Sequence, residues 1–507
     1  MILSIIIFLP LILGLLVVFF TTEKTVRPVA FVLALLQFAF SLCLLQQFDP
    51  SSASLQLVER YSWIEPFGIT YFVGIDGISL WLVLLTTFLT PIIFLGSFTS
   101  IAKNFKSFSV HMFILETALV GSFLSMDAIL FYIFFEASLI PMYFIVGIWG
   151  GPRRIYATIK FFIYTMLGSL LMLLAIIGMM IMAGEQLGQV SASLLDFYKL
   201  QIPFVEGTLW SPQAMMFLAF ALAFAIKVPL FPVHTWLPDA HVEAPTPGSV
   251  ILAGVMLKLG TYGFLRFVLP LFPEAVESWG CWISILGLIG IIYGAWVAMV
   301  QPDIKKLVAY SSVSHMGYVI LGLFALNIYG VTGAYYQMLN HGISTGALFL
   351  LVGMIYERTH SREIKEYGGL ASVMPLFTIA FFIITLSSIA VPGTNGFIGE
   401  FLILMGTFIH SPWMGVVAAT GVVFGAVYML WMFKRVFFGE AGNIVRHHKE
   451  VLTDLSLREK VVLAPMILFA IWMGVFPQHF LKWSKPSLDH FIANKGQYHL
   501  QIKGETE

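Results

Sequence analysis

The sequence has little cysteine, little charge and no motif typical of soluble enzymes, and each shortage excludes a class of protein. Cys43 and Cys281 are the only cysteines in 507 residues, which excludes a disulfide framework and a cysteine-ligated iron–sulfur cluster. Charged residues make up 11% of the chain, against about 25% in a soluble domain. The 27 basic and 27 acidic residues cancel, which argues against a nucleic-acid partner. No P-loop, dinucleotide fingerprint or zinc spacing is present.

Hydrophobic residues, in contrast, make up 59% of the chain, and the mean hydropathy is +0.91. This composition predicts an all-α polytopic membrane protein. At about 20 apolar residues per span, the sequence predicts about fourteen transmembrane helices. The predicted spans are 2–20, 28–46, 77–98, 110–125, 128–148, 158–183, 212–233, 247–271, 280–300, 304–325, 330–356, 372–408, 412–436 and 459–478. Residues 47–76 have the alternation and turns of a short hairpin, and the charged stretch 437–458 is expected to contact a partner or the membrane surface.

Lysine and arginine gather in every second connection between these spans. Eighteen of them follow odd-numbered spans, whereas only Arg60 and Lys199 follow even-numbered ones. The positive-inside rule therefore predicts cytoplasmic odd connections and both termini outside. The C-terminal tail departs from this pattern with Lys482, Lys485, Lys495 and Lys503. Arg266, near a helix end, is expected to reach the interface.

Two lysines then remain at depth in consecutive predicted spans. Lys227 and Lys258 lie in the stretch 212–270, in which two apolar segments flank a short polar bridge. A lysine at the bilayer centre costs about 2.5–3.5 kcal/mol, so it usually faces a partner, a wet cavity or an ion path. Pro229 and Pro232 follow Lys227 closely and predict a break in that helix. Broken helices at the midplane are typical of transporter ion sites, so the pattern predicts proton transport.

Span 372–408 is too long for one bilayer crossing, and Pro392 and Gly393 precede Glu400 within it. These residues predict a second broken helix. The two broken helices, numbers 7 and 12, lie five apart, which is the placement of an inverted-topology repeat. The sequence thus divides into N-terminal helices 1–3 with a periplasmic hairpin (1–109), a first five-helix repeat (110–271), a second five-helix repeat (280–437), and a cytoplasmic connection, last helix and tail (438–507).

The ionisable residues within spans are the candidate site. We expect Glu136 to form a buried ion pair with Lys227, because pairing keeps both groups charged; a pair that only fixes helix packing is the alternative. Lys258 has no acidic residue within a helical turn and is suited to exchanging a proton near neutral pH. Alternatively, it caps carbonyls of a broken helix. Glu400 is expected to end the relay or, alternatively, to accept hydrogen bonds from freed backbone amides.

Three histidines extend this set. His315 and His341 lie within spans among serines and asparagine, and His234 follows Lys227 by seven residues, beyond the proline break. Neutral imidazoles can bridge titratable groups through water. Each could instead be a packing hydrogen-bond donor, and haem ligation would require two histidines at matching depth.

Five stretches carry a resemblance to a known family: VGIDGISLWLVLLT, DAILFYIFFEASLIPMYF, AFAIKVPLFPVHTWLPDAHVEAPTPGSVILAGVMLKLGTYGFLRF, QPDIKKLVAYSSVSHMGY and VPGTNGFIGEFLIL. With them the chain resembles the antiporter-like subunits of proton-pumping NADH:quinone oxidoreductase, respiratory complex I, most closely the M-type members. The resemblance implies fourteen transmembrane helices, two inverted five-helix repeats and broken helices 7 and 12. It also implies that Glu136 pairs with Lys227, that Lys258 is the central relay lysine, and that Glu400 is the helix 12 residue.

The resemblance further implies partners, cofactors and location. Other membrane-arm subunits, of the L and N types, and lipids would be the partners. FMN, iron–sulfur clusters and quinone would lie in partner subunits, with no cofactor or metal in this chain. The membrane would be the bacterial inner membrane or the mitochondrial inner membrane. Two alternatives stay open, a subunit of a multisubunit Na⁺/H⁺ antiporter and a structural spacer without pumping. A quinone-site enzyme is a more distant third.

Overall fold

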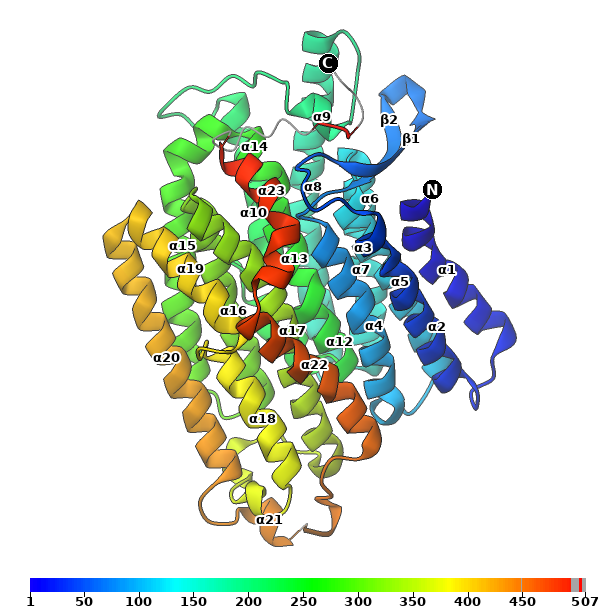
Figure 1. Cartoon of the computed structure of the whole chain (residues 1–507), viewed down its shortest axis with the longest axis vertical. Coiled ribbons are helices and arrows are strands. Elements are labelled where there is room, and N and C mark those ends of the chain that lie inside the picture. Colours follow the sequence, from blue (N-terminus) through cyan, green and yellow to red (C-terminus); the bar gives the residue numbers. More distant parts are fainter. Residues whose placement is uncertain (448, 494–500, 504–507) are drawn as a thin grey trace.

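Long apolar helices dominate the computed structural model, which describes residues 1–447, 449–493 and 501–503; Lys495 of the predicted tail lies outside these residues. Figure 1 shows the helices running side by side. Among the described residues, eleven helices are long and apolar enough to cross a membrane, or twelve if a bent pair counts as one span. Lipid offers no hydrogen bonds, so the backbone is satisfied within these helices. The polytopic all-α fold is confirmed, while the count of fourteen stays a prediction.

The long helices begin and end within seven residues of the predicted spans. They are α1 (Ile2–Phe20), α2 (Val26–Ser41) continued by α3 (Cys43–Gln47), α4 (Leu80–Ser100), α5 (Phe105–Leu124), α6 (Ala128–Ala137) continued by α7 (Leu139–Trp149), α8 (Arg154–Leu187), α15 (Pro273–Met299), α16 (Ile304–Phe324), α17 (Ile328–Thr359), α20 (Pro412–Phe437) and α22 (Leu457–Val475). One further span joins α12 (Thr246–Ile251), the π-helix η2 (Leu252–Met256), α13 (Leu257–Gly263), the π-helix η3 (Phe264–Val268) and α14 (Leu269–Leu271).

The predicted break in helix 7 is confirmed. α10 (Pro212–Lys227) ends at the lysine, and α11 (Trp236–Glu243) begins after an irregular connection. Pro229 has no N–H to donate to Ala225, so the N–H of Leu230 donates to that carbonyl instead, at 2.7 Å. The indole N–H of Trp236 donates to the freed carbonyl of Ile226 at 2.8 Å. The break therefore satisfies its own backbone and leaves Lys227 at a helix C-terminus.

Helix 12 is also broken as predicted, into α18 (Pro375–Ser388) and α19 (Asn395–His410). Gly393 adopts a left-handed conformation in the link, with φ of +90°. Asn395 opens α19, and its side-chain oxygen accepts hydrogen bonds from the hydroxyls of Ser387 and Ser344. The Asn340 side-chain amide donates to the backbone carbonyl of Asn395 at 2.7 Å, so polar side chains concentrate at the break.

Polar elements lie at the two ends of the helices. At one end, the hairpin of β1 (Gln56–Ile64) and β2 (Ile69–Ile75) pairs antiparallel and confirms the predicted hairpin. The N-terminus and the short helix α9 (Leu194–Phe197) lie at the same end, and α21 (Asn443–His447) lies at the opposite end (Figure 1). The basic connections predicted to be cytoplasmic lie toward the α21 end.

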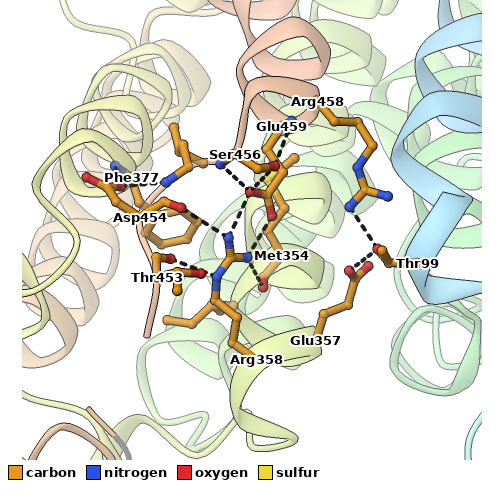
Figure 2. A network of polar contacts seen from close by, with 12 residues as sticks. Thr99, Met354, Glu357, Arg358, Phe377, Thr453, Asp454, Ser456, Arg458 and Glu459 are labelled. Carbon is orange, nitrogen blue, oxygen red and sulfur yellow. Dashed lines mark hydrogen bonds and ion pairs between the residues drawn. The ribbon is translucent and has the colours of Figure 1, made fainter. Parts of the chain in front are cut away.

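The stretch 437–458, expected to contact a partner or the membrane, contacts helices of its own chain. Figure 2 shows Arg358, near the end of α17, donating to the Thr453 carbonyl of this stretch at 2.9 Å. Arg358 also donates to both carboxylate oxygens of Glu459, just beyond the stretch, at 2.7 and 2.8 Å. The Asp454 carboxylate accepts the N–H groups of Leu376 and Phe377 in the first turn of α18, as an acidic cap does. These contacts fix the first half of broken helix 12 against α17.

The predicted C-terminal tail forms a further helix, α23 (Gln478–Ala493), bent by 66° from α22. Its apolar side chains recur at helical spacing, and Phe480, Leu488 and Phe491 are buried against the bundle. The helix is amphipathic, and its mean hydropathy is too low for a membrane span. A search of the sequence for long apolar runs therefore did not predict it.

Arg266 does not reach the interface as expected. It is 1% exposed, and its Nη2 lies 2.7 Å from Oδ2 of Asp76, which follows β2. Burial by itself would raise the pKa of Asp76, but the Arg266 guanidinium and the hydrogen bonds from Ser79 hold that pKa below its usual value. The prediction for Arg266 was wrong because it considered only the position of Arg266 near a helix end. Its acidic partner, Asp76, lies in a distant segment of the sequence.

We expect Arg266→Met to destabilise the chain, because it removes the guanidinium that pairs with the buried Asp76 carboxylate at 2.7 Å. Breaking one partner of a buried ion pair costs about 3–5 kcal/mol. The thermal unfolding of the detergent-solubilised protein measures this. Lys199→Met is the control, since the Lys199 side chain is 61% exposed and such changes stay within about 0.5 kcal/mol. Equal unfolding temperatures for the two variants would contradict the role of the pair.

Candidate functional site

Glu400 and His315 are in direct contact at the centre of the second half of the chain. Glu400 lies on α19 and His315 on α16, and His315 Nδ1 is 2.8 Å from Glu400 Oε1. Gln337 on α17 donates to the same oxygen at 3.0 Å. The close approach of α17 to α19 requires glycine, since a Cβ on Gly399 would lie 2.4 Å from the Gln337 side chain. A buried carboxylate thus faces one titratable and one fixed donor.

Lys258 is in contact with His341. The lysine lies on α13, directly after the π-helix η2, and is fully buried. Its Nζ lies 2.8 Å from His341 Nδ1 on α17 and donates to the carbonyl of Ala253 in η2 at 2.5 Å. Gly342 and Gly254 lie close together at this crossing. The carbonyl contact fits the capping alternative and the imidazole contact fits the relay interpretation, so the geometry is compatible with both.

His341 and His315 connect these two contacts. Their ring centroids are 5.9 Å apart, and the Nε2 atom of each has no partner among the described residues. Both line a small cavity with Gln337, Asn340 and Ser387. The centre of a water molecule can occupy about 10 Å³ of this cavity, which is about the space that one water molecule requires. The four groups from Lys258 to Glu400 therefore form one line, with room for a water at its middle; we call it the central line.

Glu136 and Lys227 are within electrostatic range of one another, but the described residues include no direct ion pair between them. Lys227 Nζ lies 3.5 Å from the Ser138 hydroxyl and 4.6 Å from the centroid of the Phe135 ring. Glu136 lies on α6 beside Ser169. The structure thus places the two side chains within electrostatic range of one another but without the direct ion pair that was expected.

His234 lies apart from the central line. Its ring is buried in the connection between α10 and α11, stacked on Phe231 and against Tyr293 at 5.7 and 5.2 Å. Lys160 is within electrostatic range of this ring. Lys160 itself pairs with Asp239 at 2.7 Å. The structure thus places His234 among aromatic rings, as a packing histidine would be.

His241 was missed by the sequence analysis. It lies on α11 with its ring stacked on Phe349 at 4.6 Å, and neither ring nitrogen has a partner among the described residues. It is within electrostatic range of both Lys258 and Lys305. The sequence offered one signal, the position of His241 in the bridge sequence WLPDAHVEAP. Its stacking on Phe349 and the electrostatic effect of two lysines on it arise only in the folded chain.

A large polar cavity opens at the α21 end, beyond His241. Its volume is about 650 Å³, and Glu243, Lys305, Arg362 and Arg458 line it together with the contacts of Figure 2. Lys305 is 7% exposed, and its Nζ donates to the carbonyl of Ala244 at 2.5 Å. We call this cavity the vestibule. Lys305 on its wall and Lys258 in the central line are both within electrostatic range of His241.

The chain is similar in sequence and fold to known proteins. Residues 125–425, which hold the central line and both broken helices, match the family model described as NADH:quinone oxidoreductase/Mrp antiporter, transmembrane. The chain belongs to this family. A similar relative, NADH-quinone oxidoreductase subunit M of Rhodobacter capsulatus, is 45% identical over 95% of this chain and 92% of its own. NADH-ubiquinone oxidoreductase chain 4 of Arabidopsis thaliana is 43% identical over 94% of this chain and 93% of its own.

Solved structures agree with this membership of the NADH:quinone oxidoreductase/Mrp antiporter family. A chain of respiratory complex I from Thermus thermophilus superposes with a TM-score of 0.86 at 32% identity, covering 98% of this chain and all of that one. A chain of the Mrp complex from a Dietzia species superposes with a TM-score of 0.79 at 18% identity, covering 97% and 99%, which shows a shared fold. The chain is therefore a multi-pass membrane protein of the antiporter-like type.

Proposed function

We propose that this chain is a proton-translocating, non-redox membrane-arm subunit of NADH:quinone oxidoreductase, in the bacterial or mitochondrial inner membrane. The observation that carries the proposal is the central line: Lys258 to His341 at 2.8 Å, and His315 to Glu400 at 2.8 Å. An amine, two imidazoles and a carboxylate in series can each hold or release a proton. Isolated charges at this depth are costly, so a line of them favours transport over a structural role.

Protons enter, in this proposal, from the vestibule. Lys305 lies at its floor and is held by backbone carbonyls with no acidic hydrogen-bond partner among the described residues. His241 is within electrostatic range of both Lys305 and Lys258, and neither of its ring nitrogens has a partner among the described residues. In this proposal a proton passes from Lys305 to His241 and from there to Lys258. The carbonyl of Ala253 holds the amine facing His341 while it waits for a proton.

Glu136 and Lys227 act as the switch. The two charges are close but separate, with Ser138 beside the amine. A movement that brings them into contact neutralises Lys227 electrostatically, and a movement apart exposes Lys258 to its positive field. Moving one charge against 100 mV costs about 2.3 kcal/mol. This chain has no group that releases such energy, so it comes from partner subunits.

The partners supply the redox chemistry. FMN, iron–sulfur clusters and quinone are bound by other subunits, and this chain binds no cofactor or metal. The L-type and N-type antiporter-like subunits are the neighbours in the membrane arm. The relative named subunit M spans nearly the whole of this chain.

His241→Phe tests the inlet. Phenylalanine keeps the stacking on Phe349 but removes both ring nitrogens, so the variant should assemble normally and take up protons more slowly. We expect the loss of one positioned acid–base group to slow transfer by about 10²-fold or more. Stopped-flow uptake of protons by the purified complex in vesicles measures it. His111→Phe, a histidine at the exposed start of α5, is the control. An unchanged rate in His241→Phe would exclude this route.

A multisubunit Na⁺/H⁺ antiporter is the second candidate, because the Mrp chain shares the fold. The 45% identity to a subunit M relative favours the oxidoreductase. Isolating the chain from its native membrane separates the two. Copurification with FMN and iron–sulfur clusters supports the oxidoreductase, and copurification with antiporter subunits alone supports the antiporter.

A further inference from the structure

The outer side of α17, facing away from the central line, carries an apolar groove. Leu339 and Ile343 are four residues apart and share that outer face, whereas His341 points the other way. The groove has a volume of about 380 Å³ and its wall exposes only apolar atoms. We call it the outer groove and define it by Phe38, Trp81, Phe88, Leu339, Ile343 and Trp472.

Water does not fit the outer groove. A buried water requires about two to four polar partners, and the wall offers none. The rim is accessible from outside the bundle, since Leu42 and Trp472 are each 39% exposed. At this level of the fold the surrounding medium is hydrocarbon. The chemistry of the wall therefore selects an apolar chain.

The elbow between α22 and α23 places one end of the groove at the membrane–water interface. The indole N–H of Trp472 donates to His479 Nδ1 at 3.0 Å, and that of Trp81 donates to the carbonyl of Phe480 at 3.0 Å. Tryptophans with one polar contact and an apolar ring mark the headgroup level of a bilayer. Figure 1 shows α23 turning away from α22 here. A chain in the groove would have its headgroup at this elbow.

A cation lies at the same elbow. Lys482 is exposed, and its Nζ lies 5.7 Å from the Trp483 ring, which is 6.3 Å from the Trp81 ring of the groove wall. Lys482 makes no ion pair with any described residue, whereas Lys485 pairs with Asp489. A lysine at headgroup level attracts the phosphate of an anionic lipid. Charge complementarity thus favours an anionic lipid.

We propose that the outer groove binds an acyl chain of an anionic phospholipid, with its phosphate held by Lys482. The bound chain fills the space behind α17 and braces the helix that carries His341 and Gln337. Lipid binding in the outer groove does not depend on the proposed proton transfer, so an experiment can disprove either one without the other.

The test uses the purified complex in vesicles with phosphatidylglycerol that carries a photoreactive diazirine on its acyl chain. After illumination, mass spectrometry maps the labelled peptides. We expect labelling within residues 469–480 and 38–45 to exceed that of the lipid-facing surface of α8. Leu42→Trp fills the rim and should lower groove labelling about tenfold, which corresponds to about 1.4 kcal/mol. Leu36→Trp, on the same helix and 58% exposed, should leave it unchanged.

Lys482→Gln tests the headgroup. It should lower labelling by phosphatidylglycerol and leave labelling by the matched phosphatidylcholine probe unchanged. Groove labelling that is insensitive to Leu42→Trp would overturn the proposal, as would equal labelling by the two lipids in the unaltered chain. Cross-links from these peptides to a neighbouring subunit, without lipid adducts, would show a protein helix in the groove and overturn it too.

Discussion

Lys258→Met is expected to uncouple the complex, so that NADH oxidation continues while proton pumping through this chain falls by about 10²-fold or more. Methionine has a similar length and an apolar end, so it suits a fully buried position. It removes the amine that contacts His341 Nδ1 at 2.8 Å and thereby opens the central line at its first group. The ratio of protons pumped to electrons transferred, in vesicles holding the purified complex, measures this loss.

Lys306→Met is the matched control for Lys258→Met. Lys306 is a half-buried lysine at the start of α16, outside the central line. Its replacement removes one lysine without touching the relay, so the pumping ratio should stay at the level of the unaltered complex. Full pumping by Lys258→Met would remove the lysine from the mechanism and favour its alternative role as a cap for the Ala253 carbonyl.

Glu400→Gln is expected to block the other end of the central line. Glutamine keeps an oxygen that accepts hydrogen bonds from Gln337 and His315, so the local packing survives. It cannot ionise, and proton release at this end should fall by about 10²-fold or more. The pumping ratio is again the measurement, with NADH oxidation showing that the complex has assembled.

Glu440→Gln provides the comparison for Glu400→Gln, because the Glu440 side chain is 95% exposed beyond α20. Its loss should change neither the pumping ratio nor assembly. If Glu400→Gln pumped as well as Glu440→Gln, the relay role of Glu400 would be contradicted. The Glu400 carboxylate would then only accept structural hydrogen bonds, which is the alternative given in the sequence analysis.

The sequence predicted the features that depend on local chemistry. Proline removes a donor wherever it stands, so Pro229 and Pro392 predicted both helix breaks. The deep lysines and Glu400 were predicted in the same way, because any charge in an apolar run is conspicuous. The hairpin followed from the alternation of residue types over 47–76.

What the sequence did not predict depends on packing between distant segments. Lys258 and His341 are 83 residues apart and meet only because α13 and α17 cross closely. Only the folded structure identifies His241 as a candidate site residue, because its ring stacks on Phe349 and lies within electrostatic range of two lysines. The separation of Glu136 from Lys227 likewise depends on side-chain conformations, which residue type does not determine.

The central claim is that one continuous proton path runs through the middle of the fold. Its most direct test is a map of the assembled complex in lipid, at a resolution that shows ordered water. We predict a water between His315 and His341 in the cavity they share, and further waters joining Lys227 to Lys258 and the vestibule to His241. Apolar side chains filling those gaps, with no water between the two lysines, would contradict the account.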